Sequence, residues 1–322
     1  MRIAVLTSGG DAPGMNAAIR SVVRTSISHN WEALGIMRGY EGLLEGSIVP
    51  FGARDVGGII GAGGTMLGSS RSQEFTTEAG QKHAIQVLQN NKIDALIVIG
   101  GNGTQKGSYA LSEKGYPVIG IASTIDNDLY GSDQTIGVDT ALNIAVEAID
   151  SIKITASSHH RVFAIEVMGR DCGYLALMAG IAGGAEVIII PEIDINLEDI
   201  AAELHQAYEK GKPHAIIVVA EGAKFNAAAL AEYFTDDKQW PGFELRTTVL
   251  GYVQRGATPT VYDRLLATQL GAAAVDFAVK KDFGILVGMI NNKITATPLE
   301  VAATTKKRLD KNLIELAEIL AK

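Results

Sequence analysis

Cysteine is almost absent from the sequence, which has Cys172 alone among 322 residues. A single cysteine excludes an internal disulfide framework and favours a reducing compartment such as the cytoplasm. No apolar run approaches the roughly 20 residues that span a bilayer, so we expect no membrane-spanning helix. The first residues also lack a basic segment leading into a long apolar stretch, and we expect no signal peptide.

Positive charge is scarce as well. The chain has 28 lysines and arginines against 36 aspartates and glutamates, a formal net charge of −8, which disfavours nonspecific binding to nucleic acid. Arginines that hold phosphate groups must therefore act as local clusters. The chain is long enough for two ordinary domains, and 47% hydrophobic with 20% charged residues is the balance of a globular protein with a buried core.

Short apolar runs rich in β-branched residues recur along the chain and predict strands. They cover residues 3–6, 95–99, 118–121, 162–167, 187–190, 215–220 and 285–290. The runs are continuous rather than alternating, as expected for a parallel sheet covered by helices on both faces. Helical spacing of apolar residues predicts a helix over 138–155, and Asn291-Asn292 predicts a hairpin turn with one antiparallel pair. The sequence therefore predicts an α/β fold.

Three polar or glycine-rich loops follow predicted strands, at residues 7–16, 100–104 and 123–128. Ligands of open α/β sheets bind beyond the carboxyl ends of the strands, where all three loops would lie. Gly9 and Gly10 would let backbone N–H groups approach a phosphate, and the helix expected after Pro13 would direct its positive end towards it. Neither glycine loop matches the dinucleotide or phosphate-loop patterns, so a purely structural turn is an equal alternative.

The third loop places Thr124, Asp126 and Asp128 within five residues. One carboxylate is suited to accept a proton from a sugar hydroxyl while the other helps to hold a metal ion. The alternative is an Asp-Asn turn whose side chains cap their own backbone.

Five segments of the chain, in order, carry a resemblance to a known family: TSGGDAPGMNAAIR (7–20), TIDND (124–128), SSHHR (157–161), MGRDCG (168–173) and GYVQRG (251–256). By this set the chain resembles the bacterial-type ATP-dependent 6-phosphofructokinases over nearly its whole length. The resemblance implies two similar three-layer α/β domains with mostly parallel sheets. The larger, nucleotide-binding domain would cover 1–137 with 252–301, and the smaller, sugar-phosphate-binding domain 138–251 with 302–322. It also implies a homotetramer whose active sites are shared between subunits.

The resemblance assigns roles to residues of the catalytic and nucleotide sites. Asp126 would be the base, with Thr124 and Asp128 beside the transferred phosphate, and Asn102 and Asp128 would be the residues at Mg²⁺. Arg71, Arg170 and Gly10 would stabilise the transferring group. The residues expected to bind ATP are Gly10, Tyr40, Arg71, Ser72, Gly101, Asn102, Gly103 and Thr104.

Two further sets are implied in the same way. The residues expected to bind fructose 6-phosphate are Thr124, Asp126, Asp128, Arg161, Met168, Gly169, Arg170, Glu221, Arg246, Tyr252 and Arg255. Guanidinium groups suit a phosphate dianion because they donate two parallel hydrogen bonds. An effector site for ADP or phosphoenolpyruvate would use Arg20, Arg24, Arg54, Lys153, Glu186, Lys210, Lys212 and His214. Without the motifs, each charged residue would be read as a solvated surface group.

The sequence also departs from the family pattern. Asn102 stands where relatives carry an aspartate associated with the metal, and Tyr252 replaces a histidine that touches the sugar phosphate. Ser72 replaces an aromatic residue near the adenine, and Ala53 occupies an effector arginine position with Arg54 beside it. An amide oxygen should bind magnesium less strongly than a carboxylate.

The phosphate donor is predicted from two other positions. Pyrophosphate-using relatives carry an acidic residue at the position of Gly103 and a lysine at that of Ser123, so this chain is expected to use a nucleotide.

The leading hypothesis is phosphoryl transfer from ATP to the 1-hydroxyl of fructose 6-phosphate, a step of glycolysis. One alternative is a low-activity or noncatalytic paralogue that regulates or binds metabolites, suggested by Asn102 and Tyr252 and opposed by the retained Asp126, Asp128 and Arg170. A dinucleotide-dependent dehydrogenase would need a glycine pattern that the first loop lacks. A kinase acting on another hexose phosphate also remains open.

Overall fold

The computed structural model describes residues 1–209, 211–212, 214–235 and 244–321. The chain forms two compact units, each with its own sheet. Unit 1 comprises Met1–Thr140 and Arg255–Lys307, and unit 2 comprises Ala141–Gln254 and Arg308–Lys322. These divisions fall a few residues from the domain boundaries drawn from the sequence. Which ligand each unit binds stays a prediction.

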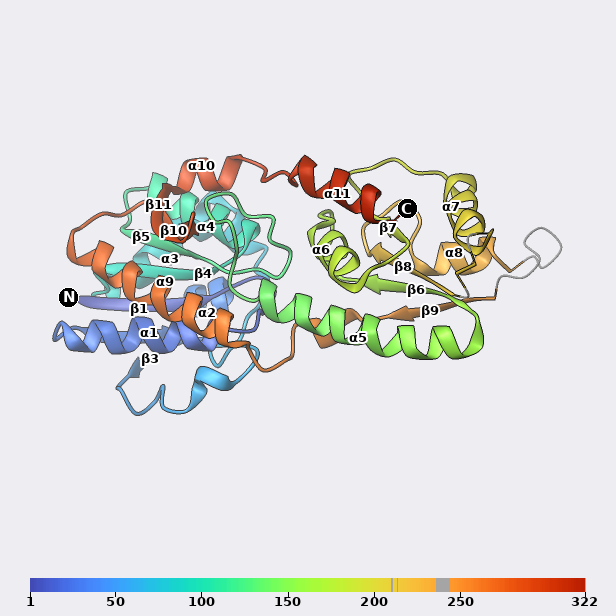
Figure 1. Ribbon diagram of the computed structural model, residues 1–322. Coiled ribbons are helices and arrows are strands. Elements are labelled where there is room, and N and C mark those ends of the chain that lie inside the picture. Colours follow the sequence, from blue (N-terminus) through green and yellow to red (C-terminus); the bar gives the residue numbers. More distant parts are fainter. Residues whose placement is uncertain (210, 213, 236–243, 322) are drawn as a thin grey trace. The chain divides into compact units, whose positions relative to one another are not determined.

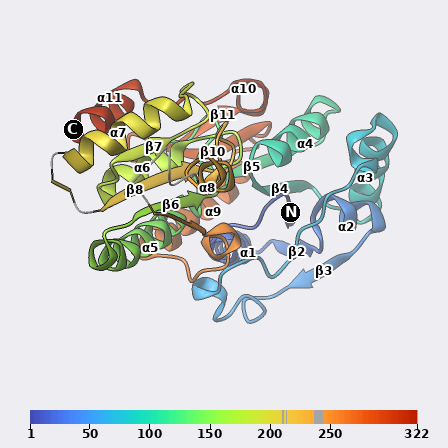
Figure 2. The same ribbon diagram turned by 90° about the vertical axis from the view of Figure 1, so that its right-hand side faces the viewer.

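Unit 1 contains a seven-stranded sheet in the order β11-β10-β5-β4-β1-β2-β3 (Figures 1 and 2). Its strands are β1 (Arg2–Thr7), β2 (Glu32–Ile36), β3 (Ile48–Phe51), β4 (Ala95–Gly100), β5 (Val118–Ala122), β10 (Ile285–Ile290) and β11 (Lys293–Pro298). The two outermost pairs, β10 with β11 and β2 with β3, are antiparallel, and all other pairs are parallel. The mostly parallel sheet agrees with the α/β fold class predicted from the sequence.

Helices cover both faces of this sheet. The elements are α1 (Met15–Ser28), α2 (Gly39–Glu45), α3 (Glu78–Asn90), α4 (Asn102–Glu113), α9 (Val261–Val279), α10 (Leu299–Thr304) and the 3₁₀ helices η1 (Ile59–Gly61) and η2 (Glu74–Thr76). Helices α1 and α9 pack against each other on one face, whereas α2, α3, α4 and α10 pack on the other (Figure 1). Burial on both faces explains why β1, β4 and β5 are continuous apolar runs.

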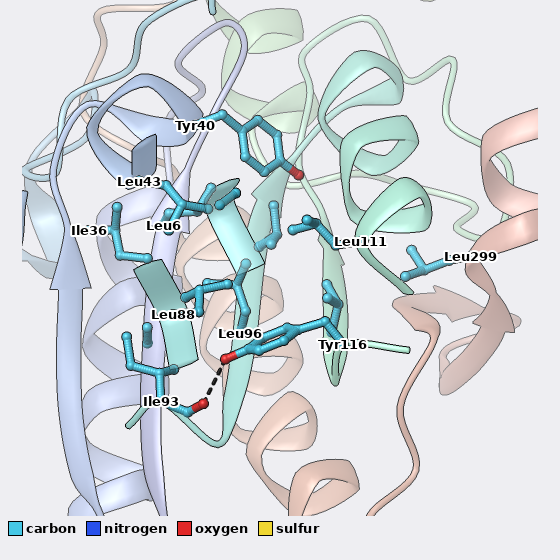
Figure 3. Close-up of a cluster of buried hydrophobic side chains, with 14 of the residues drawn as sticks. Leu6, Ile36, Tyr40, Leu43, Leu88, Ile93, Leu96, Leu111, Tyr116 and Leu299 are labelled. Carbon is cyan, nitrogen blue, oxygen red and sulfur yellow. Dashed lines mark hydrogen bonds between the residues drawn. The ribbon is translucent and has the colours of Figure 1, made fainter. Parts of the chain in front are cut away.

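The core on the α2–α4 face is drawn in Figure 3, where Leu6, Leu96 and Leu111 converge from β1, β4 and α4. Tyr116 is 7% exposed, and its hydroxyl donates to the carbonyl of Ile93 at 2.7 Å. A buried phenol needs such a partner because an unpaired polar group inside the core would be destabilising. This packing fixes the strands whose carboxyl ends carry the three loops.

Unit 2 contains a four-stranded, fully parallel sheet in the order β7-β8-β6-β9. Its strands are β6 (Val162–Val167), β7 (Val187–Ile189), β8 (Ala215–Ala220) and β9 (Leu245–Val249). Its helices are α6 (Tyr174–Gly183), α7 (Leu197–Glu209), α8 (Ala227–Tyr233), α11 (Lys311–Ala321) and η3 (Gly251–Gln254), and α5 (Val138–His159) begins in unit 1 and continues through unit 2. Helices α7 and α8 cover the apolar face built from β6, β7 and β8.

The predicted apolar runs all form strands, and the predicted helix 138–155 extends to His159. The hairpin is confirmed: Asn291 and Asn292 have φ values of 51° and 57°, as a two-residue turn between antiparallel strands requires. Strands β2, β3 and β9 were not predicted. Pro50 interrupts the pattern of β3, which is tolerated because β3 lies at a sheet edge. No helix within the described ranges is long and apolar enough to cross a membrane.

Candidate active site

The three loops predicted from the sequence meet at the carboxyl ends of the neighbouring strands β1, β4 and β5. The backbone N–H of Ser8 donates to Ile99 at 3.1 Å, and the Thr104 hydroxyl donates to the Ser8 carbonyl at 2.9 Å. The Asn102 side-chain amide donates to the backbone carbonyl of Asp128 at 3.3 Å. Residues distant in sequence thus form one polar surface within unit 1.

The first loop leads from β1 into α1 and brings Gly10 against Arg255. A Cβ added to Gly10 would lie 1.8 Å from Nη1 of Arg255, so the guanidinium occupies the space that any side chain at position 10 would need. The Nε of Arg255 is buried and has no hydrogen-bond partner within the described ranges. Gly10, which is expected to bind the nucleotide, and Arg255, which is expected to bind the sugar phosphate, are therefore in contact.

The second loop is the start of α4, which begins at Asn102 with Gly101 as its N-cap. The first N–H groups of a helix have no partner within the helix, and with the helix dipole they attract anions. Gly103 is exposed, and a Cβ added there would meet nothing within 4 Å. This helix start therefore has room for a phosphate group.

Tyr40, predicted to bind the nucleotide, belongs to the core in the structure (Figure 3). It is 5% exposed, its hydroxyl donates to the Thr104 carbonyl at 2.8 Å, and its ring stacks on Phe75 with 3.9 Å between ring centres. Burial raises the pKa of Tyr40, so its hydroxyl stays protonated and can donate. The arrangement makes Tyr40 a support for the start of α4.

The other two residues predicted beside the nucleotide lie ahead of η2. Arg71 is exposed. The Ser72 hydroxyl accepts a hydrogen bond from the backbone N–H of Phe75 at 3.2 Å. Ser72 therefore starts the η2 turn, and Arg71 is free to extend into solvent.

The third loop carries the predicted base. Asp126 is 7% exposed, and its backbone N–H donates to the Thr124 hydroxyl at 3.2 Å. The hydroxyl of Thr135 donates to the Thr124 carbonyl at 2.6 Å. Asp128 is half-buried. The loop is thus a structured turn. It holds the Asp128 carboxylate near the surface of unit 1 and shields that of Asp126 from solvent.

A second group of predicted residues forms a turn in unit 2. The side-chain Oε1 of Glu221 accepts from the backbone N–H groups of Gly169 at 3.2 Å and Arg170 at 2.7 Å. The Oε1 of Gln254, which is fully buried, accepts from the N–H of Met168 at 2.9 Å. Arg170 itself is exposed and has a φ of 51°. Two side chains therefore fix the backbone of this turn and leave the arginine side chain in solvent.

The two arginines predicted to bind the 6-phosphate, Arg161 and Arg246, both pair with the carboxylate of Glu244. The Arg161 Nε lies 2.5 Å from Oε2 of Glu244, and Arg246 contacts Oε1. The hydrogen bond from Arg161 lowers the pKa of Glu244. The structure brings the two guanidinium groups together around one anion. Tyr252, the one departure from the family pattern among the residues expected to bind the sugar phosphate, is 81% exposed on η3.

The predicted effector residues divide between the units. In unit 1, Arg20 and Arg24 lie on α1, and Arg24 donates to the Ala53 carbonyl at 3.3 Å, beside Arg54. In unit 2, Lys212 pairs with Glu186 at 3.2 Å, and Lys153 donates to the Gly183 carbonyl at 2.8 Å. His214 is half-buried. Lys210 lies outside the described residues.

Unit 2 also contains a cavity of about 300 Å³ beneath α7 and α11. Its wall is mainly apolar, from Leu177, Ile188, Ile190, Ile193 and Ile314, and it includes the Glu186–Lys212 pair. None of the residues predicted to take part in catalysis lines it. Within the described ranges, no group of three histidine, cysteine or acidic residues could hold a metal ion.

One residue that the motifs did not reveal is Asp263, which is fully buried on α9. It accepts hydrogen bonds from the N–H groups of Gly137 and Thr140, both at 2.8 Å, and from the Thr140 hydroxyl. Burial, opposed by these hydrogen bonds, raises the pKa of Asp263 to about 6. Asp263 thereby caps the start of α5. The signal in the sequence was Thr260 three residues before Asp263, a helix-capping pattern.

Comparisons with known proteins give one consistent result. Residues 2–278 match the protein family described as Phosphofructokinase. The chain is 50% identical to "ATP-dependent 6-phosphofructokinase" of Brevibacillus brevis over 320 residues, 99% of each chain. It is also 50% identical to "ATP-dependent 6-phosphofructokinase 1" of Thermus thermophilus over 322 residues, again 99% of each.

Solved structures agree. A phosphofructokinase from Saccharomyces cerevisiae superposes with a TM-score of 0.85 and 36% identity, and the match covers 99% of this chain but 46% of the yeast chain. A pyrophosphate-dependent phosphofructokinase from Marinobacter aquaeolei shares the fold, with a TM-score of 0.86 and 23% identity over 97% of this chain and 86% of that one. The resemblance drawn from the motifs is confirmed.

Proposed function

Because the chain belongs to the phosphofructokinase family, we propose that it transfers the terminal phosphoryl group of ATP to the 1-hydroxyl of fructose 6-phosphate. The product is fructose 1,6-bisphosphate, and the reaction is a step of glycolysis. The observation that carries the proposal is the meeting of three loops in unit 1, which places Asp126, Gly10 and the start of α4 on one polar surface. The names of relatives at 50% identity favour a working kinase over a noncatalytic paralogue.

Asp126 serves as the base in this reaction. Phosphoryl transfer requires little covalent assistance, so a kinase works mainly by positioning the two substrates and placing positive charge around the transferred group. A carboxylate that is 7% exposed and carried on a hydrogen-bonded turn is well placed to accept one proton from a bound sugar hydroxyl. By the family resemblance, Arg71 and Arg170 supply positive charge to the transferring group, and both side chains are exposed.

The donor is a nucleotide bound at the start of α4. The N–H groups of Asn102, Gly103 and Thr104 would face its phosphates there, and the exposed Gly103 leaves room for close approach. Ser123 is fully buried, and its hydroxyl donates to the Ile136 carbonyl at 3.3 Å. A lysine at this position, as in pyrophosphate-using relatives, would have to enter a buried space. The curated relatives are named for ATP.

Magnesium accompanies the nucleotide, held by Asp128 with the amide oxygen of Asn102. Mg²⁺ keeps several waters and usually takes only one or two protein carboxylates together with the phosphates of the substrate. The pair of Asp128 and Asn102 fits this donor set, since the two residues are joined by a hydrogen bond and both are half-buried. When bound, the ion would neutralise charge on the phosphates.

A second set of residues is proposed for the sugar phosphate. Arg161 and Arg246 hold the 6-phosphate, which takes the place of the Glu244 carboxylate between their guanidinium groups. The Met168–Arg170 turn and Glu221 meet the sugar, with Arg255 and Tyr252 as further contacts.

The residues proposed for an ADP or phosphoenolpyruvate effector are Arg20, Arg24, Arg54, Lys153, Glu186, Lys210, Lys212 and His214.

We also propose a homotetramer whose active sites are shared between subunits. Large apolar side chains stay exposed in each unit, among them Val249, Tyr252 and Val253 in unit 2 and Val261 and Leu265 in unit 1. Contiguous exposed apolar groups mark protein interfaces.

The buried, single Cys172 is compatible with a reducing compartment, and we place the enzyme in the cytoplasm.

The purified chain, incubated with ATP, magnesium and fructose 6-phosphate, tests the proposal. We expect ³¹P NMR to show fructose 1,6-bisphosphate formed with ATP and not when pyrophosphate replaces it. Sedimentation of the same preparation should give the mass of a tetramer. Absence of product with ATP, or product from pyrophosphate alone, would refute the assignment.

A further inference from the structure

Lys307, the last residue of unit 1, places its ammonium group among three oxygen atoms of the stretch 124–135, which begins in the third loop. Its Nζ donates to the Ser132 carbonyl at 2.7 Å, the Asp133 carbonyl at 2.8 Å and the side-chain oxygen of Asn127 at 3.1 Å. An ammonium group has three donors and no acceptor, so a site built from three oxygens matches it. The contact joins residues about 180 positions apart in the chain.

Asn127 connects this contact to the predicted base, because it lies between Asp126 and Asp128. It is 2% exposed and has a φ of 52°, a backbone conformation that needs support from its surroundings. Its side-chain nitrogen donates to the Asp133 carbonyl at 3.0 Å, and its oxygen accepts from the Thr135 N–H at 3.1 Å. Lys307 therefore adds to a network that closes the stretch 124–135 on itself.

The charge of Lys307 matters in addition to its geometry. The stretch 124–135 carries three aspartates, at positions 126, 128 and 133, and no lysine or arginine. Lys307 brings one positive charge to it from a segment outside the loop. Because the ammonium is half-buried, its field on the loop is screened less than that of a surface lysine.

We propose that Lys307 is a positioning residue for phosphoryl transfer. Its ammonium group holds the turn that carries Asp126 and offsets the negative charge gathered there. The inference rests on the proposed function, since it assigns a role within the same reaction. Neither the motifs nor the resemblance pointed to this residue.

The first test compares Lys307→Ala with Lys306→Ala. Lys306 is the exposed neighbour, and its bridge to Leu129 is made by the backbone, so its substitution leaves that bridge intact. We expect Lys307→Ala to lower kcat about tenfold or more, the loss typical of a hydrogen-bonded charged group, with the KM values for both substrates within about twofold of wild type. Lys306→Ala should match wild type. Wild-type kcat in Lys307→Ala would overturn the proposal.

Chemical rescue separates positioning from simple loss of stability. Lys307→Ala leaves space beside three oxygens, and n-propylammonium can fill it and donate hydrogen bonds. We expect this amine to raise the kcat of Lys307→Ala by about threefold or more in a saturable way, since it restores the hydrogen bonds of the ammonium group. Tetramethylammonium, which has no donor, should have no effect. A loss of activity that follows the thermal unfolding midpoint and is not rescued by the amine would contradict the proposal.

If Lys307→Ala does not fold, Lys307→Gln carries the test, because the amide donates to the same oxygens without a charge. Its kcat is expected below that of wild type, and wild-type kcat would overturn the role of the charge. The proposed function is judged separately by wild-type turnover. An inactive wild type refutes the function. If the wild type is active, wild-type kcat in Lys307→Ala, or a loss of activity that the amine does not rescue, refutes only this inference.

Discussion

In unit 1 the proposed base, Asp126, is 7% exposed, whereas in unit 2 the proposed phosphate-binding Arg170 is exposed to solvent. The turn around Asp126 is held through its own side chains, with Asn127 at the centre of a network that reaches Thr135 and Lys307. At the Arg170 turn, the side chains of Glu221 and Gln254 accept hydrogen bonds from the backbone.

The difference follows from what each group must do. A base must meet one proton at hydrogen-bonding distance, so its carboxylate needs a fixed position. An arginine has a long flexible side chain and can find a phosphate once its Cα is placed. We therefore expect changes around Asp126 to affect kcat, and changes in the support of the Arg170 turn to affect mainly the binding of the sugar phosphate.

The largest effect in unit 2 is expected from Arg170→Ala. Loss of one group that stabilises charge in the transition state lowers kcat by about 10²–10³-fold. Because the side chain is exposed, the free energy of unfolding should change by no more than about 0.5 kcal/mol. Steady-state kinetics and denaturant unfolding check both, with the exposed Arg308→Ala as the control. A large loss of stability would show that Arg170 supports the turn itself.

Gln254→Met tests the backbone support of the same turn. The substitution keeps the size of the side chain but leaves the buried N–H of Met168 without a partner. We expect the KM for fructose 6-phosphate to rise about tenfold, with the KM for ATP within about twofold of wild type. Gln86→Met, at an exposed position of α3, is the matched control. An equal rise in both KM values would remove the distinction between the two turns.

Asn102→Asp probes the departure from the family pattern in unit 1. The Asn102 amide donates to the Asp128 carbonyl, which an aspartate cannot do, and a carboxylate would add negative charge beside Asp128. We expect kcat to fall about fivefold, the loss of one modest hydrogen bond, rather than to rise. Asn90→Asp, which adds the same charge on the exposed surface of α3, is the control. A higher kcat would mean that metal binding limits the natural enzyme.

Asp263→Asn should have the smallest effect on turnover, since Asp263 caps α5 and is not among the residues proposed to bind or act on the substrates. Its effect is on stability. Burial raises the pKa of Asp263 from 3.8 to about 6, so the folded state favours the neutral acid. The stability that the protonated form contributes is fully present below pH 3.8 and is lost as the pH rises through about 6.

The difference in free energy of unfolding between wild type and Asp263→Asn should therefore shift in favour of the variant by at most about 3 kcal/mol between pH 4 and pH 7. Denaturant unfolding across this range measures it. A constant difference would mean that the hydrogen bonds from Gly137 and Thr140 cancel the effect of burial.

Much of the fold could be predicted because the central strands are buried on both faces and so read as continuous apolar runs. Strands β3 and β9 escaped prediction because they lie at sheet edges with exposed or half-buried residues, and β2 because Glu32 and Gly35 interrupt its apolar run. The site was predictable where its residues share a short motif, as Thr124, Asp126 and Asp128 do. Lys307 was not, because its contacts depend on a fold that brings together distant segments.

The residue type also concealed some roles. Tyr40 and Glu221 were assigned to ligands by resemblance, yet in the structure the Tyr40 hydroxyl supports α4 and Glu221 accepts from two backbone N–H groups. A sequence names the side chain but not the partner that its polar atoms have already taken. Their roles in binding stay predictions.

The most direct test is a rapid-quench measurement of a single turnover by Asp126→Asn, with labelled ATP and fructose 6-phosphate. We expect the rate of phosphoryl transfer to fall by about 10²–10⁴-fold, the contribution of a general base. Binding of both substrates and the unfolding midpoint should stay close to wild type, and the exposed Asp282→Asn should transfer at the wild-type rate. A wild-type rate in Asp126→Asn would contradict the assignment of Asp126 as the base.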